Sequence, residues 1–302
     1  MSTLKIAIVG AGAVGGYLVA KLAQNDYDIT LVVKDKYLQD IQENGLSVLD
    51  YKQGEFTVYP YTVDSLDNEI YDVIFIATQS CDYESACQSI QKAVDTNTLI
   101  IPLSDGLGIS STLKKYLPSC IIGEGLIHII TQIQSPRIIH RKSFTFYLQI
   151  AVEQENINLK ILEQLLNHSD LRTTASKSLR YERWKKYLFT STVSMLTTYF
   201  DKPIGYIFNE HLELMIDILM EIQKVANAKD ICITNQDIEK VVKQASHVEY
   251  ETKTIMQINF ENKKKTEFNS IVTYIVKEAN LLNINIPQIE KIYTTLKEKT
   301  LS

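Results

Sequence analysis

This sequence lacks the signatures of several large classes of protein. Its 302 residues include four cysteines, with no C-x-x-C pair, and five histidines at scattered positions that do not suit a metal ion. No apolar run is long enough to span a membrane, and no signal peptide is evident before the first apolar run. The net charge of -5 argues against a general nucleic-acid binder. We therefore expect no metal, no membrane partner, no nucleic-acid partner, and reduced thiols in the cytoplasm.

Glycine is also scarce, with 11 residues, but three glycines stand together near the start of the chain. Ile6–Val9 is a continuous apolar run, which is typical of a strand buried on both faces. The pattern G-x-G-x-x-G follows directly at residues 10–15, and helical periodicity then extends from Ala13 to Gln24. A second strand is indicated at Ile29–Val33. In this context the pattern predicts a βαβ unit that binds a dinucleotide, and a purely structural glycine turn is the alternative.

Each glycine of the motif has a physical role in such a unit. Gly10 permits the tight turn out of the strand, Gly12 lets a pyrophosphate approach the backbone, and Gly15 lets the helix pack closely on the sheet. The helix N-terminus presents free N–H groups and a positive dipole end to the phosphates. The cofactor-binding residues predicted here are Gly10, Ala11, Gly12, Ala13, Val14 and Gly15.

Lys34, directly after the second strand, bears on the choice of cofactor. A NAD site usually carries an acidic residue near this position, whereas a NADP site prefers a basic one. Lys34 favours the 2′-phosphate, although Asp35 beside it is acidic. We therefore predict NADPH/NADP+ rather than NAD, with an ordinary charged loop as the alternative.

Two further apolar runs, Val73–Ala77 and Leu99–Leu103, predict more strands of the same parallel sheet. Ligands bind at the carboxyl ends of such strands, so the loops that follow them should converge with the glycine loop. Gln79 and Asp105 lie in these loops and complete the predicted cofactor site. The competing explanation is that strand ends need turns for structural reasons alone.

The second half of the chain has a different character. Strand-like patterns persist from Ile121 to Ile150, whereas nearly everything from Tyr181 onward is helical. We predict an α/β Rossmann-type dinucleotide-binding domain at 1–177 and an all-α C-terminal domain at 178–302. Lys263–Lys265 is the one compact basic run, and it is expected to be a solvated helix end. The apolar spacing within Thr266–Leu282 predicts a helix that packs in the core.

The first helix of the C-terminal half carries a polar stripe at i, i+4, i+8 and i+11. Its members are Lys186, Thr190, Ser194 and Thr197. One amine and three hydroxyls on one face can line a site or face solvent, and spacing alone favours solvent.

Over almost its full length the sequence resembles the ketopantoate reductase (2-dehydropantoate 2-reductase) family. AIVGAGAVGGYLVAKL is similar to the family's glycine loop, and WKKYLFTSTVSMLT to its W-x-K-x-x-x-N-x-x-x-N-x-x-T element. TEFNSIV, from Thr266, is similar to the closing T-E-I element. The resemblance implies that Lys186 is the catalytic lysine and that Glu267 is the substrate-site glutamate. It also places Thr190, Ser194 and Asn259 among the substrate-binding residues.

Several positions depart from the family pattern. Gln79 stands where the family usually has lysine. Asp105, Thr190 and Ser194 stand where it usually has asparagine, Asn259 where it has aspartate, and Ile255 where it has serine. In the family, residues at these positions hold the hydroxyls and carboxylate of pantoate and the nicotinamide ribose. The resemblance therefore implies the fold and the hydride chemistry more strongly than it implies which substrate accepts the hydride.

The implied function is an NADPH-dependent reduction of ketopantoate to pantoate in pantothenate biosynthesis. Lys186 would protonate the nascent alkoxide and stabilise its charge. The expected partners are a small 2-keto acid and a second copy of the chain in a homodimer. The alternatives are a reductase of another small 2-keto acid, an opine-type dehydrogenase, and a non-catalytic nucleotide-binding homologue.

Overall fold

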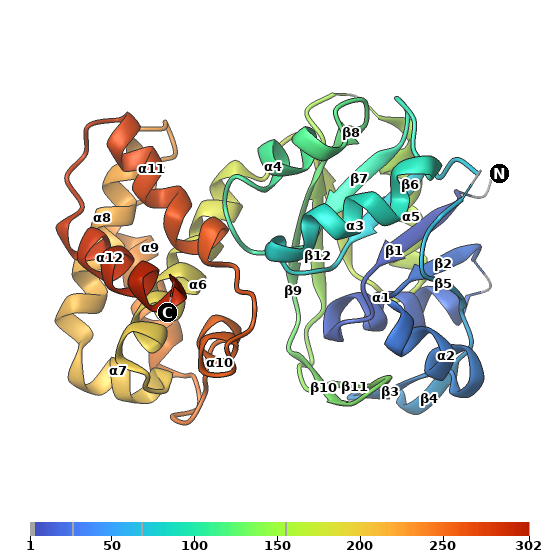
Figure 1. The fold of residues 1–302 in the computed structure, drawn as a ribbon, viewed down its shortest axis with the longest axis horizontal. Helices are drawn as coiled ribbons and strands as arrows, with labels where there is room; N and C mark the ends of the chain where they lie inside the picture. The colour runs from blue at the N-terminus through green and yellow to red at the C-terminus, as the bar shows by residue number, and fades with distance from the viewer. Residues whose placement is uncertain (1–3, 26, 68, 155, 302) are drawn as a thin grey trace. The chain divides into compact units, whose positions relative to one another are not determined.

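The structure is a computed structural model that describes residues 4–25, 27–67, 69–154 and 156–301, and these residues divide into two compact units (Figure 1). The first unit comprises the chain up to Ser104 together with Ile109–Leu179. The second comprises Asp105–Gly108 and the chain from Arg180 onward. An α/β unit followed by a helical unit confirms the predicted fold class, while the boundary at 177/178 stays a prediction.

A six-stranded parallel sheet forms the centre of the first unit, in the order β5-β2-β1-β6-β7-β8. Its strands are β1 (Ile6–Val9), β2 (Ile29–Val32), β5 (Tyr61–Val63), β6 (Val73–Ile76), β7 (Leu99–Pro102) and β8 (Ile121–Ile122). Every residue of β1, β2, β6 and β7 is buried, which explains their continuous apolar runs. The predictions for these four strands are confirmed to within one residue.

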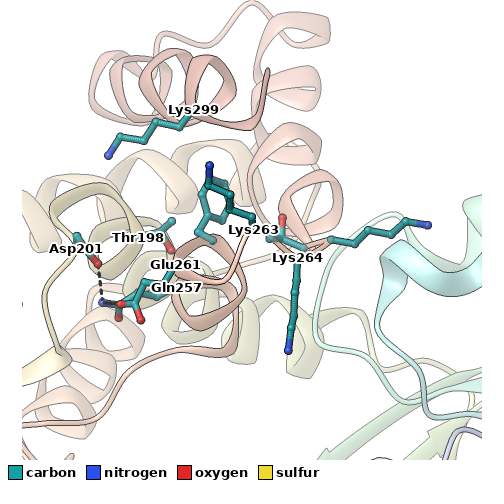
Figure 2. A pocket seen from close by; sticks show the side chains of 10 residues that line it. Thr198, Asp201, Gln257, Glu261, Lys263, Lys264 and Lys299 are labelled. Carbon is teal, nitrogen blue, oxygen red and sulfur yellow. Dashed lines mark hydrogen bonds between the residues drawn. The ribbon is translucent and has the colours of Figure 1, made fainter. Parts of the chain in front are cut away.

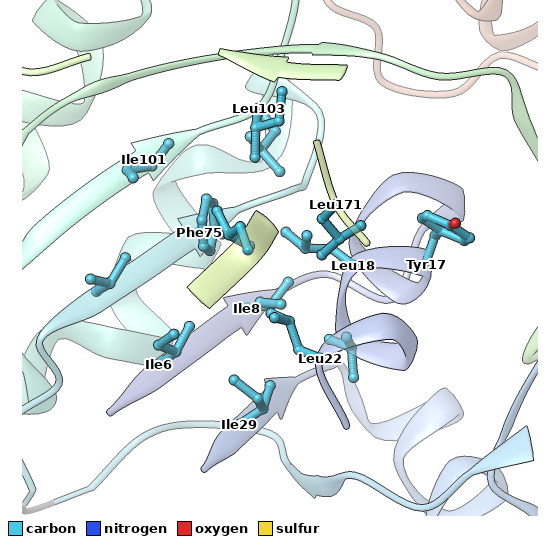
Figure 3. Close-up of a cluster of buried hydrophobic side chains, with 14 of the residues drawn as sticks. Ile6, Ile8, Tyr17, Leu18, Leu22, Ile29, Phe75, Ile101, Leu103 and Leu171 are labelled. Carbon is cyan, nitrogen blue, oxygen red and sulfur yellow. The ribbon is translucent and has the colours of Figure 1, made fainter. Parts of the chain in front are cut away.

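Successive residues of the central strands enter cores on opposite faces of the sheet. Ile6 and Ile8 pack in a cluster with Leu18 and Leu22 of helix α1, as Figure 3 shows. Their neighbours in β1 join a second cluster with residues of α3 and α4. The helices of this unit are α1 (Ala13–Ala23), α2 (Asp35–Asn44), α3 (Tyr83–Ile90), α4 (Ile109–Tyr116) and α5 (Ile157–His168). Helices on both faces are what a buried parallel sheet requires.

Two smaller sheets complete the first unit. One has the order β10-β11-β3-β4 and consists of β3 (Leu46–Asp50), β4 (Gly54–Val58), β10 (Thr131–Ser135) and β11 (Ile138–Arg141). The other has the order β13-β12-β9 and consists of β9 (Glu124–His128), β12 (Tyr147–Ala151) and β13 (Thr173–Ser176). The irregular strand pattern predicted between Ile121 and Ile150 therefore corresponds to strands of all three sheets.

The described part of the second unit is helical. Its helices are α6 (Arg180–Phe200), α7 (Ile204–Glu210), α8 (Leu212–Asn227), α9 (Asn235–Ser246), α10 (Ile255–Glu261), α11 (Tyr274–Leu281) and α12 (Pro287–Leu301). Helix α6 packs against α7, α8, α9, α10 and α12, so it is the central element of this unit. Among the helices of the described residues, none combines the length and apolar character needed to cross a bilayer.

The helix predicted over Thr266–Leu282 begins differently from the expectation. It starts at Phe268 and continues through a π-helical segment, Asn269–Thr273, into α11. Its apolar face of Phe268, Ile271, Val272 and Ile275 is buried in the core, which confirms the predicted packing role. Glu267 lies immediately before the helix and not inside it.

A buried ion pair holds the glycine-loop helix against the second sheet of the first unit. Parallel pairing of β11 with β3 places Arg141 opposite Asp50, and an Arg141 Nη1 donates to Asp50 Oδ2 at 3.1 Å. The Tyr17 hydroxyl of α1 donates to the same oxygen at 2.9 Å. Burial opposes ionisation of Asp50, but N–H groups of Lys52 and Gln53, the Tyr17 hydroxyl and Arg141 outweigh it. The net effect lowers the pKa of Asp50.

Removing the Asp50 charge should destabilise the protein. Asp50→Asn leaves Arg141 buried without its counter-ion, and breaking such a pair costs about 3 kcal/mol of unfolding free energy. The pKa of Asp50 is depressed in the folded state, so its contribution is complete above about pH 4, the ordinary pKa. It is lost as the pH falls further. Urea denaturation should therefore show a large difference in unfolding free energy between wild type and variant near neutral pH, and a smaller difference in acid.

Asp40→Asn is the matched control for this measurement. Asp40 pairs with Arg137 at 3.4 Å, but both side chains are partly exposed, and such pairs contribute at most about 1 kcal/mol. Equal destabilisation by the two variants would contradict the role assigned to Asp50.

Candidate functional site

The glycine loop joins β1 to α1 in a conformation that requires glycine at its first position. Gly10 has φ of +107°, in the region that L side chains rarely adopt, and its N–H donates to Val32 O at 2.9 Å. A Cβ atom at Gly10 would also lie 3.0 Å from Thr78 Cγ2. The tight turn predicted for Gly10 is therefore a property of the fold.

Gly12 and Gly15 differ in what surrounds them. A Cβ at Gly15 would lie 2.1 Å from Gly10 O, so only glycine allows α1 to pack here. A Cβ at Gly12 would meet nothing closer than Ala77 O at 4.0 Å, and the backbone at Gly12 is extended, with φ -65° and ψ 178°. The space in front of Gly12 thus lies at the start of α1, where helix N–H groups are free to bind an anion.

An unpaired polar atom lies beside this loop. The side-chain oxygen of Thr78, two residues after the end of β6, is buried and has no hydrogen-bond partner within the described chain. Phosphate and ribose groups can supply such a partner. The open face of Gly12 and the unpaired Thr78 oxygen together fit a dinucleotide.

The other predicted cofactor residues of the first unit follow neighbouring strands. Lys34 is exposed and precedes α2, just beyond the end of β2. Gln79 is partly buried and precedes a short 3-10 turn that follows β6. Since β1, β2 and β6 are adjacent and parallel, Lys34, Gln79 and the glycine loop lie at the same edge of the sheet. This is the edge at which such sheets bind ligands.

Asp105 belongs to the second unit and contacts Lys186. Its Oδ1 lies 2.6 Å from Lys186 Nζ, and the side chains are 33% and 19% exposed, respectively. The sequence placed Asp105 with the cofactor residues, whereas the structure pairs it with the lysine on α6. Asp105 and Lys186 are far apart in the sequence, so the acidic side chain next to Gly106 could not by itself indicate that they form an ion pair.

The loop that carries Asp105 packs on the helix that follows Glu267. Leu107 N–H donates to Ser270 O at 3.1 Å. A Cβ at Gly106 would lie 2.4 Å from Ser270 Cβ, so the approach of the two backbones depends on glycine. The carbonyl of Glu267 accepts the Ser270 N–H at 3.1 Å. Lys186, Asp105 and Glu267 therefore belong to three segments that pack together in the second unit.

The polar stripe on α6 is partly exposed at one end and buried at the other. Lys186 and Thr190 are partly buried, whereas Ser194 is 3% exposed and Thr197 is 0% exposed. Thr197 Oγ1 shares a hydrogen bond of 2.9 Å with Thr254 Oγ1, whose residue caps α10. The solvent-facing alternative is therefore wrong for Ser194 and Thr197.

Asn259 lies on α10, a helix that the sequence analysis did not predict. With seven residues, α10 is too short to show clear periodicity. Asn259 is partly buried, and its carbonyl accepts the Lys264 N–H at 2.8 Å. Within the described residues, no group of three or more His, Cys, Asp or Glu side chains is arranged to hold a metal ion.

Tyr187, the neighbour of Lys186, is unsuited to proton transfer. It is completely buried, and its hydroxyl donates to Ile271 O. Burial raises the pKa of Tyr187 far above the ordinary range. Tyr187 therefore cannot replace Lys186 as a proton donor on this part of α6.

Two family models match the chain, one over each half. The family model described as ketopantoate reductase PanE/ApbA matches residues 6–152, and the model of its C-terminal domain matches residues 178–300. An uncharacterized oxidoreductase, YkpB, of Bacillus subtilis (strain 168) is 23% identical, with 97% of this chain and 98% of the relative covered. A 2-dehydropantoate 2-reductase of Nostoc sp. is 24% identical, with 98% and 95% covered.

The fold also occurs in a solved structure with another stated substrate class. A ternary structure of D-mandelate dehydrogenase with NADH and anilino(oxo)acetate has a TM-score of 0.86 and 22% identity. The alignment covers 98% of both chains. At this identity the likeness shows a shared fold.

The different surroundings of Gly12 and Gly15 predict different effects when each is replaced by valine. Gly12→Val should abolish NADPH binding, because the branched side chain fills the space in front of the loop, while the extended backbone accepts valine. Gly15→Val should instead destabilise the fold, because its Cβ collides with Gly10 O. Calorimetric titration with NADPH and thermal melts distinguish these effects. A folded Gly12→Val variant that binds NADPH tightly would rule out the dinucleotide site.

Proposed function

Because the chain belongs to the ketopantoate reductase family of oxidoreductases, we propose that it reduces ketopantoate to pantoate with NADPH, as a step of pantothenate biosynthesis. The observation that carries the proposal is the position of Lys186. Its ammonium group lies on α6 beside Asp105, and Glu267 belongs to an adjoining segment. The glycine loop supplies the geometry that a nicotinamide dinucleotide needs.

Reduction of a 2-keto acid requires a hydride at C2 and a proton on the carbonyl oxygen. A bound nicotinamide supplies the hydride. As the carbonyl bond becomes a single bond, Lys186 donates a proton from Nζ to the oxygen and stabilises its developing charge. Because Lys186 is partly exposed, solvent can return the proton to the amine.

The remaining residues of the second unit hold the substrate and the lysine. Asp105 positions Lys186 Nζ through the 2.6 Å ion pair. Glu267, Thr190, Ser194 and Asn259 supply hydrogen-bonding groups for the substrate hydroxyls and carboxylate. Four free cysteines are consistent with a reducing compartment, and we assign the enzyme to the cytoplasm.

A reductase of a different 2-keto acid is the second candidate. Hydroxyls on Thr190 and Ser194 offer shorter hydrogen-bonding groups than the amides usual in the family. The fold is also used by D-mandelate dehydrogenase. Both observations concern the acceptor and leave the role of Lys186 unchanged.

Steady-state oxidation of NADPH tests the proposal directly. The panel should contain ketopantoate, 2-oxoisovalerate, benzoylformate, and pyruvate with and without an amino acid. We expect the highest kcat/KM with ketopantoate. Higher kcat/KM with another acceptor would identify the second candidate, and no oxidation with any acceptor would indicate a non-catalytic homologue.

Lys34 should determine the preference for the phosphorylated cofactor. Lys34→Ala removes a charge-assisted hydrogen bond to the 2′-phosphate, so the KM for NADPH should rise about tenfold or more, while the KM for NADH should change little. Lys115→Ala, a change at another exposed lysine, is the control. A wild-type enzyme that prefers NADH would refute the assignment.

Lys186 should control the chemical step. Lys186→Ala should lower kcat by about 10²–10⁴-fold, the usual contribution of general acid catalysis, with little change in NADPH affinity. Lys185→Ala is the matched control, since Lys185 is the adjacent residue and lies 4.0 Å from Asp237. Equal effects of the two substitutions on kcat would contradict the proposed role of Lys186.

A further inference from the structure

The second unit contains a cavity of about 540 Å³ that the proposed reaction does not use (Figure 2). It is lined by ends of α6, α10 and α12 and by the loop after α10, with Thr198, Gln257, Phe260, Thr266 and the run Lys263–Lys265 among the lining residues. Thr198 lies more than three turns, about 18 Å, along α6 from Lys186. The Thr198 end of the cavity is therefore remote from the reacting carbonyl, whereas Thr266, another lining residue, directly precedes Glu267.

The basic run Lys263–Lys265 is held at this cavity by the C-terminus of α10. Lys263 N–H donates to Phe260 O at 3.0 Å and Lys264 N–H to Asn259 O at 2.8 Å, the paired bonds of a Schellman motif. Lys263 occupies the left-handed position of that motif, with φ of +51°, where glycine is usual. The run does end a helix, as expected from the sequence, but it also lines a cavity.

The charges of the cavity favour an anion. No side-chain hydrogen bond or ion pair engages the exposed side chains of Lys263, Lys264 or Lys265 within the described residues. The two carboxylates of the cavity, on Asp201 and Glu261, contact other side chains. Glu261 accepts bonds from Lys253 at 2.8 Å and from Gln257 Nε2 at 3.0 Å, and Gln257 Nε2 also reaches Asp201 at 3.5 Å.

Two buried polar side chains of the cavity lining lack hydrogen-bond partners. Gln257 is 1% exposed and Thr198 is 5% exposed. Gln257 Oε1 and Thr198 Oγ1 have no partner among the described residues. Buried polar atoms rarely stay unpaired, and an amide oxygen can only accept, so its partner must donate an O–H or N–H.

We propose that this cavity binds a phosphate monoester that also carries free hydroxyl groups. The phosphate contacts ammonium groups of the exposed run Lys263–Lys265, which serve as point charges, and a hydroxyl donates to Gln257 Oε1 or bonds to Thr198 Oγ1. Phe260 packs against the carbon skeleton. The volume is within the range of small-molecule sites. This binding does not depend on the proposed reductase activity.

Ribose 5-phosphate is a suitable probe, with inorganic phosphate and ribose as comparisons. Calorimetry should use the Gly12→Val chain, in which the dinucleotide site is closed, as well as wild type. We expect ribose 5-phosphate to bind both chains equally and about tenfold more tightly than inorganic phosphate, and ribose not to bind. Binding to wild type alone would place the ligand in the dinucleotide site and overturn the proposal.

Matched variants distinguish specific binding in the cavity from non-specific attraction of the phosphate to lysines. The double variant Lys264→Gln, Lys265→Gln should lose at least about tenfold in affinity, whereas Lys115→Gln, Lys291→Gln removes the same charge from other exposed positions, which do not line the cavity, and should bind normally. Thr198→Val should weaken ribose 5-phosphate binding and leave inorganic phosphate unchanged. Equal affinity for the two phosphates, or equal losses in both double variants, would overturn the proposal.

Lys263→Gly distinguishes loss of binding from loss of fold. Glycine suits the left-handed position, so thermal stability should stay the same or rise while ribose 5-phosphate binding weakens. Unchanged binding in this variant would contradict a contact between Lys263 and the phosphate.

Discussion

The ion pair between Lys186 and Asp105 is the contact on which the candidate site depends. Both side chains are partly exposed, and ion pairs of this kind contribute at most about 1 kcal/mol to stability. The pair therefore matters because it positions the ammonium group of Lys186, not because it stabilises the fold. Asp105 follows β7 in the chain, while Lys186 lies on the central helix of the second unit, and the pair fixes the ammonium group relative to the loop 105–108. Gly106 permits the same loop to reach the turn after Glu267.

The glycine loop depends on a second constraint, which is steric. Gly15 must lack a side chain for α1 to pack, and Gly10 must lack one to make the turn. Tyr17, Asp50 and Arg141 then secure α1 against the neighbouring sheet. Gly12 is the one glycine of the three that packing does not require, since a Cβ there would meet nothing closer than 4.0 Å.

Sequence patterns predicted most of the first unit because its signals are local. Continuous apolar runs marked the buried strands, and the spacing of three glycines marked the loop. The contacts of Asp105 with Lys186 and of Leu107 with Ser270 join distant segments, so no local pattern could predict them. Helix α10 was missed because it is short. The basic run Lys263–Lys265 is exposed throughout, so its interpretation as a solvated helix end is confirmed, while its place beside a cavity could not be predicted from charge alone.

In the proposed reaction, hydride passes from the nicotinamide to C2 of a 2-keto acid while Lys186 donates a proton to the carbonyl oxygen. NADPH deuterated at the transferring C4 position tests it with ketopantoate, by mass spectrometry and NMR of the product. We expect pantoate with one deuterium at C2 from wild type, formed far more slowly by Lys186→Ala. Product without deuterium at C2, or equal rates from both proteins, would contradict it.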